Sequence, residues 1–203
     1  TTSRPFRGMS SEAAILSLFH CHRDDGHGED EKHRRCHTLQ LNALGIKHKS
    51  LYVGIDGTFC LNLSGTTISD LSPLVKLPVT HLCLQGCYRI ADFSPLGGMN
   101  LTWLNLCRTR VTDLSPLVGL PLSHLDLHRT RIADLRPLKN LPLKSLDMRF
   151  TEITDVSPLR HMPLKELSFY PSRIAFGLDS LSRIGSLATI NRRPADAFWQ
   201  RYG

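Results

Sequence analysis

The sequence predicts an α/β solenoid, in which short parallel strands form one face and brief helical turns form the other. Three observations lead to this fold: a seven-residue phrase that recurs five times, alternating leucines ahead of each copy, and a proline in the same place in every copy. A single coil, made of one short strand and one helical turn, cannot bury a core by itself. Stacked coils of equal length can, because their apolar faces merge.

The recurring phrase reads ISDLSPL, IADFSPL, VTDLSPL, IADLRPL and ITDVSPL. Its aspartates occupy positions 70, 92, 113, 134 and 155, so one step is 22 residues and the other three are 21. Such a period is too short for two helices and is typical of the leucine-rich repeat, which uses one strand and one turn or 3₁₀ segment per coil. We therefore predict a leucine-rich-repeat solenoid with a parallel β-sheet on the concave face and 3₁₀ segments or turns on the convex face.

Each phrase follows a segment with the spacing L-x-x-L-x-L-x-x-T. In the third coil, this spacing falls on Leu101, Leu104, Leu106 and Thr109. Alternation of this kind is strand periodicity, in which the leucines point inward and the residues between them point outward. Each strand therefore has one buried face and one face that a partner could contact.

The D-x-S-P-L part predicts the bend and the helical turn after each strand. The aspartate can accept a backbone N–H at the bend, serine is suited to cap a short helix, and proline is tolerated at the first helical position. The expected caps are Ser72, Ser94, Ser115 and Ser157, and the expected first helical residues are Pro73, Pro95, Pro116 and Pro158.

One coil is irregular, because the segment between Leu84 and Ile90 has one residue more than its equivalent after Leu106. We expect a bulge where this strand ends.

The repeats divide the chain into three parts. Residues 1–56 are predicted to form a helical N-terminal cap with a charged loop, residues 57–174 about six repeat coils, and residues 175–203 a helical C-terminal cap. Caps are expected because a solenoid exposes its core at both ends.

Helices are predicted for the caps over residues 10–22, 33–44 and 178–187, from apolar periodicity and flanking capping residues. Three aromatic residues near the end are expected to cover the last coil: Phe198, Trp199 and Tyr202.

The repeat phrase resembles the bacterial internalin-like class of leucine-rich repeats, and more closely a 21-residue variant with L-P-L or M-P-L between coils. The ending INRRPADAFW resembles the INGKPAAEFW phrase that closes many such arrays, except that Arg192 stands where that pattern has glycine. The resemblance covers roughly residues 57–203. It implies a non-catalytic protein-interaction module that binds a macromolecular partner. Some similar arrays are appended to serine/threonine protein-kinase-like modules, so the recruitment or regulatory part of a larger kinase-like protein is an alternative.

The formal charge of +7 does not by itself predict nucleic-acid binding, because it is spread along the chain. Basic and acidic residues number 8 and 6 in residues 1–50, 12 and 10 in 51–170, and 5 and 2 in 171–203. A structural subunit of a ribonucleoprotein is nevertheless an open alternative, with five arginines contacting phosphate. Interspersed acidic residues, such as Asp126 and Glu152, argue against it. The five arginines are Arg108, Arg110, Arg129, Arg131 and Arg149.

Motifs that would indicate an enzyme are missing from the sequence. It has no G-x-x-x-x-G-K-[ST], G-x-G-x-x-G, G-x-S-x-G or H-E-x-x-H. Since a repeat fills most of the chain, we expect neither catalysis nor a cofactor.

We expect no membrane association and a cytoplasmic location. No apolar run approaches the roughly 18 residues needed to cross a bilayer, and the first ten residues lack the apolar segment of a signal peptide. The six cysteines are expected to be free thiols in a reducing compartment, because a chain with a core of this size needs no disulfide framework.

A histidine- and cysteine-rich stretch in the predicted N-terminal cap is the best candidate for a metal site. Thiolate and imidazole groups suit zinc, which could join two short helices. The spacing is not that of a standard zinc finger, and a solvated loop explains the composition as well, so we predict no metal. The candidate ligands are Cys21, His22, His33 and Cys36.

The outward strand positions predict the binding surface. The first two coils offer small residues, whereas coils three to five concentrate tryptophan, arginine, histidine, aspartate and phenylalanine. Aromatic residues and arginine dominate the energy of protein-binding hot spots. The predicted partner-binding residues on the concave face are Trp103, Asn105, Arg108, His124, Asp126, His128, Arg129, Asp147, Arg149, Phe150 and Tyr170.

Overall fold

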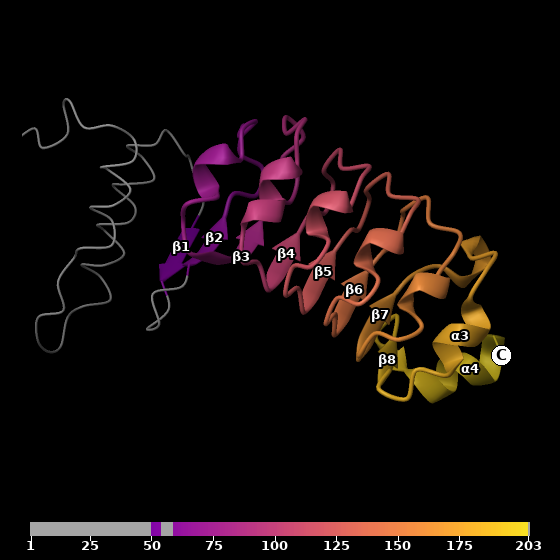
Figure 1. Cartoon of the computed structure of the whole chain (residues 1–203). Coiled ribbons are helices and arrows are strands. Elements are labelled where there is room, and N and C mark those ends of the chain that lie inside the picture. The colour runs from indigo at the N-terminus through magenta and orange to yellow at the C-terminus, as the bar shows by residue number, and fades with distance from the viewer. Residues whose placement is uncertain (1–49, 54–58, 203) are drawn as a thin grey trace, which may run out of the picture.

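The structure, a computed structural model, describes residues 50–53 and 59–202. These form a curved stack of coils in which the strands line one face and the 3₁₀ segments line the other (Figure 1). The two helices predicted for the N-terminal cap and the four candidate metal ligands, Cys21, His22, His33 and Cys36, lie outside the described residues.

The strands form a single sheet in chain order, which confirms the predicted solenoid. Neighbours from β2 to β8 are parallel, whereas β1 and β9 pair antiparallel at the two ends. Neither end strand was predicted, and β1 lies within the segment assigned to the N-terminal helical cap. The strands are β1 Ser50–Val53, β2 Phe59–Asn62, β3 Val79–Cys83, β4 Trp103–Asn105, β5 His124–Asp126, β6 Ser145–Asp147, β7 Glu166–Ser168, β8 Thr189–Ile190 and β9 Arg193–Pro194.

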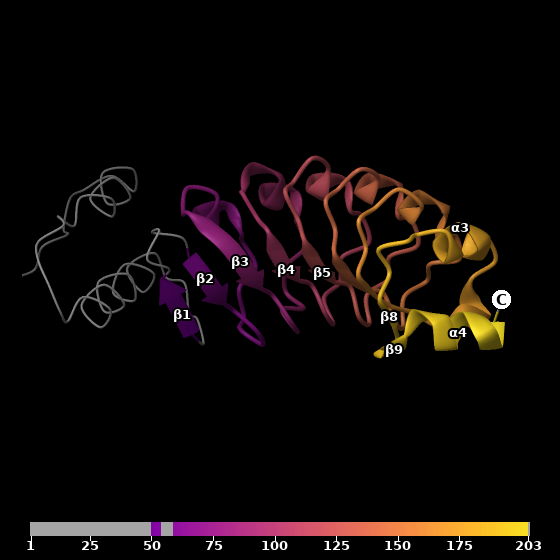
Figure 2. The same cartoon turned by 90° about the horizontal axis from the view of Figure 1, so that it is seen from below.

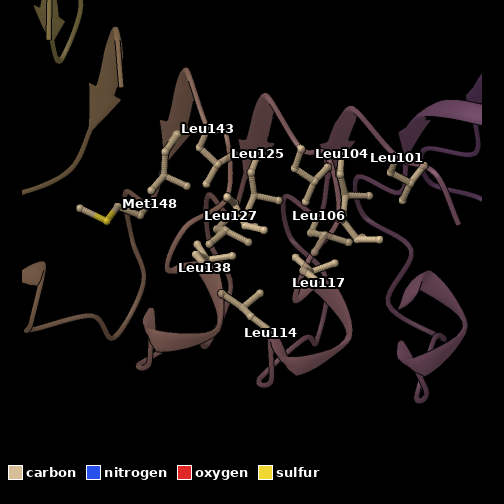
Figure 3. Close-up of a cluster of buried hydrophobic side chains, with 14 of the residues drawn as sticks. Leu101, Leu104, Leu106, Leu114, Leu117, Leu125, Leu127, Leu138, Leu143 and Met148 are labelled. Carbon is tan, nitrogen blue, oxygen red and sulfur yellow. The ribbon is translucent and has the colours of Figure 1, made fainter. Parts of the chain in front are cut away.

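The core is a ladder of leucines at equivalent positions of successive coils. The strand register aligns Leu82 with Leu104, and Leu104 with Leu125, and all three are at most 3% exposed. The second strand leucine and the leucine of the 3₁₀ segment complete each layer (Figure 3). Each fully buried leucine contributes about 1.5–3 kcal/mol, so the stack depends on coils of matching length.

The bends confirm the role predicted for aspartate and correct the role predicted for serine. Asp113 Oδ1 accepts the backbone N–H of Ser115 at 2.8 Å, and the Ser115 hydroxyl donates to the same oxygen at 2.7 Å. Serine is the first residue of this 3₁₀ segment and proline the second, and the N–H of Leu117, which a capping serine would have bonded, donates to the Leu114 carbonyl at 2.8 Å. The segments are η1 Ser72–Leu74, η2 Ser94–Gly98, η3 Ser115–Leu117, η4 Arg136–Leu138, η5 Ser157–Leu159 and η6 Pro171–Arg173.

In coils three to five, the threonine that closes the strand turn is buried and bonded to the backbone. The hydroxyls of Thr109, Thr130 and Thr151 each donate to the carbonyl three residues earlier at 2.7 Å. Cys87 holds this position in the irregular coil, and its thiol donates to the Leu63 carbonyl of the preceding coil at 2.9 Å. The extra residue therefore follows Cys87, just beyond the strand turn, where a bulge was expected.

Two helices and an aromatic contact close the C-terminal end. The helices are α3 Leu178–Ser182, shorter than the predicted 178–187, and α4 Ala195–Tyr202 (Figure 2). Phe198 is buried, with its ring centroid 5.7 Å from that of Phe169 in the last leucine-rich coil. Trp199 and Tyr202 pack around Phe198 at 5.0 and 4.8 Å. The aromatic residues thus cover the last coil as predicted.

A close approach at Gly177 gives the first testable prediction. This residue has a φ of +90°, and a Cβ there would lie 2.4 Å from the backbone nitrogen of Ser157. Gly177→Ala should lower the free energy of unfolding by more than about 2 kcal/mol, because it combines an unfavourable backbone conformation with a clash. Gly185→Ala is the matched control, since a Cβ at Gly185 meets nothing within 4 Å. Equal urea midpoints for the two variants would contradict the contact.

The aspartates of the bends predict a dependence of stability on pH. Backbone N–H and hydroxyl donors hold the pKa of Asp70, Asp92 and Asp113 below the usual value of a carboxyl group. A carboxyl whose pKa is lowered on folding stabilises the fold above its unfolded pKa and loses this effect as pH falls through its folded pKa. The free energy of unfolding should therefore fall below about pH 4. Asp113→Asn should reduce that slope in urea titrations at several pH values, and an unchanged slope would refute the assignment.

Candidate functional site

Each strand from β2 to β6 is followed by a turn that contains a residue with left-handed backbone. We call these residues the exit column: Gly65, Gly86, Arg108, Arg129 and Phe150, with φ values of 67°, 71°, 56°, 57° and 57°. Glycine adopts this conformation without strain, whereas arginine and phenylalanine do so at a cost of about 1–2 kcal/mol each. Three adjacent coils therefore keep large side chains where two others have glycine.

The first four residues of the exit column, Gly65 to Arg129, are held in this conformation by backbone amides that join adjacent coils. The N–H of Arg108 donates to the carbonyl of His128 at 2.9 Å, and the N–H of Arg129 donates to the carbonyl of Arg149 at 3.0 Å. The hydrogen bonds between coils thus continue beyond the strands. As a result, the side chains of Arg108 and Arg129 project from a backbone that is bonded to the next coil.

An exposed aromatic cluster lies on the exit side of the fourth to sixth coils. Phe150 is 46% exposed, and its ring contacts His128 and Tyr170 edge-on at centroid distances of 5.2 and 4.9 Å. The guanidinium of Arg129 lies 5.1 Å from the centre of the Phe150 ring, which is within the range of cation–π contacts. We refer to Arg129, His128, Phe150 and Tyr170 as the aromatic cluster.

The polar residues at the strand ends have a backbone role in addition to the binding role predicted for them. Asn105, Asp126 and Asp147 each accept the N–H of the residue two positions later, at 2.8, 2.8 and 3.0 Å. Burial raises the pKa of Asp126, and the His128 N–H partly offsets this effect. The carboxylates and the amide therefore shape the strand exits whether or not a partner is bound.

Arg149 is paired within the chain. Its Nε donates to Asp147 Oδ1 at 3.0 Å, and its second guanidinium nitrogen bonds Asp147 Oδ2. Because this pair is local, Arg149 offers less positive charge to a partner than the exit arginines do.

Trp103 and His124 lie at the starts of β4 and β5, whereas the residues of the aromatic cluster come after the strands. The Trp103 ring stacks on His81 at a centroid distance of 6.5 Å, and His124 Nδ1 lies 2.8 Å from the Ser123 hydroxyl. The predicted binding residues therefore divide into an entry group at the strand starts and an exit group that contains the aromatic cluster.

Cys107, which precedes Arg108 in the exit turn, has its sulfur beside a histidine of the next coil. It is buried, with its sulfur 3.4 Å from Nδ1 of His128, and burial raises the pKa of its thiol. The histidine of the next coil covers the cysteine, so the partner would meet His128 instead.

Residues that were not predicted as a site include Tyr88 and Arg89 of the irregular coil. Both are exposed and line a shallow hollow with Ser69 and Arg110. The only sequence signal for this feature is the extra residue between Leu84 and Ile90.

The described part of the chain contains neither a metal-binding group of side chains nor a membrane-spanning helix. Over residues 50–53 and 59–202, no group of three or more histidine, cysteine, aspartate or glutamate side chains is arranged to hold a metal ion. None of the helices in these ranges combines the length and the apolar character that crossing a membrane requires.

Comparisons with known proteins agree with the repeat architecture. No protein-family model and no curated protein matches the chain. Among solved structures, it is similar to the internalin inlF of Listeria monocytogenes, with 29% sequence identity and a TM-score of 0.58, over 63% of this chain and 38% of inlF. It is also similar to internalin C2 of the same species, with 29% identity and a TM-score of 0.49, over 64% of this chain and 68% of that protein.

The parallel sheet, the 3₁₀ segments and the likeness to inlF fit an internalin-like leucine-rich-repeat protein, in agreement with the resemblance stated from the sequence. The chain matches well under two thirds of the length of inlF. The likeness supports a protein-interaction module in general.

The exit column gives a prediction about stability. Arg108→Gly should raise the free energy of unfolding relative to Arg110→Gly by about 1–2 kcal/mol, because only Arg108 has a left-handed backbone that glycine relieves. Both arginines are exposed and lie two residues apart, so they are matched in type and surroundings. Urea denaturation of the two variants measures the difference, and a less stable Arg108→Gly would show that the conformation carries no strain.

Proposed function

We propose that the chain is a non-catalytic module that binds a protein partner through the exit side of coils three to six, with the aromatic cluster as the anchor. The observation that carries this proposal is the strained, exposed Phe150. It has a left-handed backbone, is 46% exposed and contacts aromatic rings on both sides. Strained residues that the surrounding structure holds in place are concentrated at ligand-binding sites.

The composition of the cluster supports a protein partner. Arginine and aromatic residues supply most of the binding energy at protein interfaces, from a few central positions. The rings are already packed against each other, so binding would order few side chains and would cost little conformational entropy. The entry group, Trp103 and His124, would extend the contact across the concave face.

Two other functions are alternatives to a protein-binding module. A ribonucleoprotein subunit would use the exposed arginines, and a recruitment role in a larger kinase-like protein would use the same binding surface. A cytoplasmic location remains a prediction from cysteine usage.

Capture experiments with paired variants test the anchor. The immobilised full chain is used to capture partners, which are identified by mass spectrometry, and the affinity for the identified partner is then measured with purified proteins. Phe150→Ala should weaken that affinity about 30-fold, because loss of an interface anchor costs about 2 kcal/mol. Val118→Ala is the control, since Val118 is 62% exposed and follows η3 on the opposite face. Equal affinities for both variants and the parent chain would exclude the aromatic cluster as the anchor.

A further inference from the structure

A row of arginines runs along the side of the solenoid, just beyond the strand exits. Arg89, Arg110 and Arg131 occupy equivalent positions in coils two, three and four, directly before the buried Ile90, Val111 and Ile132. All three arginines are exposed. The row is bounded by Thr67 in coil one and Glu152 in coil five. It therefore covers three successive coils.

The arginine row is not neutralised within the described part of the chain. Among residues 59–202, the ion pairs are Arg136 with Asp134 and Arg149 with Asp147, and neither includes a member of the row. Neighbouring strands lie about 4.8 Å apart, so successive arginines stand at close range. Like charges at this spacing repel each other. An anionic partner would remove the repulsion.

The extra residue of coil two adds a hollow to the row. Tyr88 and Arg89 occupy a place that holds one residue in the other coils, and together with Ser69 and Arg110 they line the hollow. Two arginines, a tyrosine and a serine are among the lining residues, and no acidic residue is. Such a set of donors matches a carboxylate, which arginine binds in bidentate geometry.

The exit column adds two more arginines beside the row. Arg108 and Arg129 are exposed and lie two residues before Arg110 and Arg131. Two positions after the row and after the two residues that bound it, the side chains are small and uncharged: Ser69, Ala91, Thr112, Ala133 and Thr154. Access to the guanidiniums is thus open from that side.

Acidic residues beside the arginine row limit the kind of polyanion that can bind it. Asp92, Asp113 and Asp134 lie three residues after the row in each coil, and the bend donors keep their pKa values low. Asp92 and Asp113 therefore place negative charge alongside the arginines, whereas Asp134 is paired with Arg136. A duplex nucleic acid is wide enough to meet both the arginines and these carboxylates, and the carboxylates would repel it. A single extended polypeptide is narrow enough to contact the arginines alone.

We propose that the arginine row, with the hollow at Tyr88, binds a short acidic segment of the protein partner. This inference rests on the proposed protein-interaction function and names the chemistry of the partner. Three coils span about 10 Å, which corresponds to about four residues of extended chain. Aspartate or glutamate side chains of that segment would pair with Arg89, Arg110 and Arg131, and the neighbouring aromatic cluster would take an apolar residue of the same partner.

A charge-matched pair of variants tests the proposal. The full chain is titrated into a fluorescein-labelled glutamate-rich peptide of about eight residues, long enough to span the row, and anisotropy is recorded. Arg110→Gln/Arg131→Gln should weaken binding at least tenfold. The control Arg160→Gln/Arg183→Gln removes the same charge from exposed sites outside the row and should change binding less than about twofold.

Three outcomes would overturn the acidic-peptide proposal: no binding of the peptide by the parent chain, equal loss in both double variants, or tighter binding of a DNA duplex that is lost in the same variant. The proposed function fails separately. If the peptide binds the row but Phe150→Ala leaves partner affinity intact, the arginine row stands and the aromatic anchor does not. If Phe150→Ala weakens the partner while the peptide does not bind, the anchor stands and the acidic segment is wrong.

Discussion

Every coil of this protein is held to the next by hydrogen bonds in a fixed register, and this register determines where every side chain lies. The leucine ladder from Leu61 to Ile190 is aligned only if each coil brings the chain back to the same register in the next strand. Aspartate at the bend, proline in the 3₁₀ segment and threonine at the strand turn each satisfy one local requirement of that return. When coil two gains a residue, the core register is kept and the extra length appears outside, at Tyr88 and Arg89.

The same register creates the surface that we assign to binding. The inter-coil bonds continue past the strands through the backbone of Arg108 and Arg129, which forces these residues into a left-handed conformation. Side chains at this position therefore stand at repeated intervals on a rigid edge. Phe150 and its neighbours form an apolar contact at one end of this edge, and the exposed arginines form a positive contact nearer the other. A partner with an acidic segment and an apolar residue would match both.

The regular parts of the fold could be predicted from the sequence because they repeat. Alternating leucines and the aspartate-proline phrase recur in five coils. An error in assigning the strand or the turn of one coil would therefore conflict with the other four copies. The end strands β1 and β9 could not be predicted, since each is a short antiparallel pair formed once. The buried position of Cys107 depends on a histidine of the next coil, which no local pattern shows.

The exit column illustrates the same limit at the candidate site. Arginine and phenylalanine avoid left-handed backbone, so nothing at Arg129 or Phe150 alone predicts it. The signal that was present is the alignment with Gly65 and Gly86 in the first two coils. The strand-end polar residues differ, because Asp126 and Asp147 were predicted only to contact a partner and the structure shows that both also accept backbone N–H groups.

Hydrogen exchange of individual backbone amides, followed by NMR, tests most directly whether the exit turns are fixed by bonds between coils. The amides of Arg108 and Arg129 should exchange as slowly as strand amides such as that of Leu104, because they donate to the next coil. Exchange of both amides at the rate of a freely solvated turn, with Leu104 protected, would contradict a rigid exit edge and the preformed binding surface built on it.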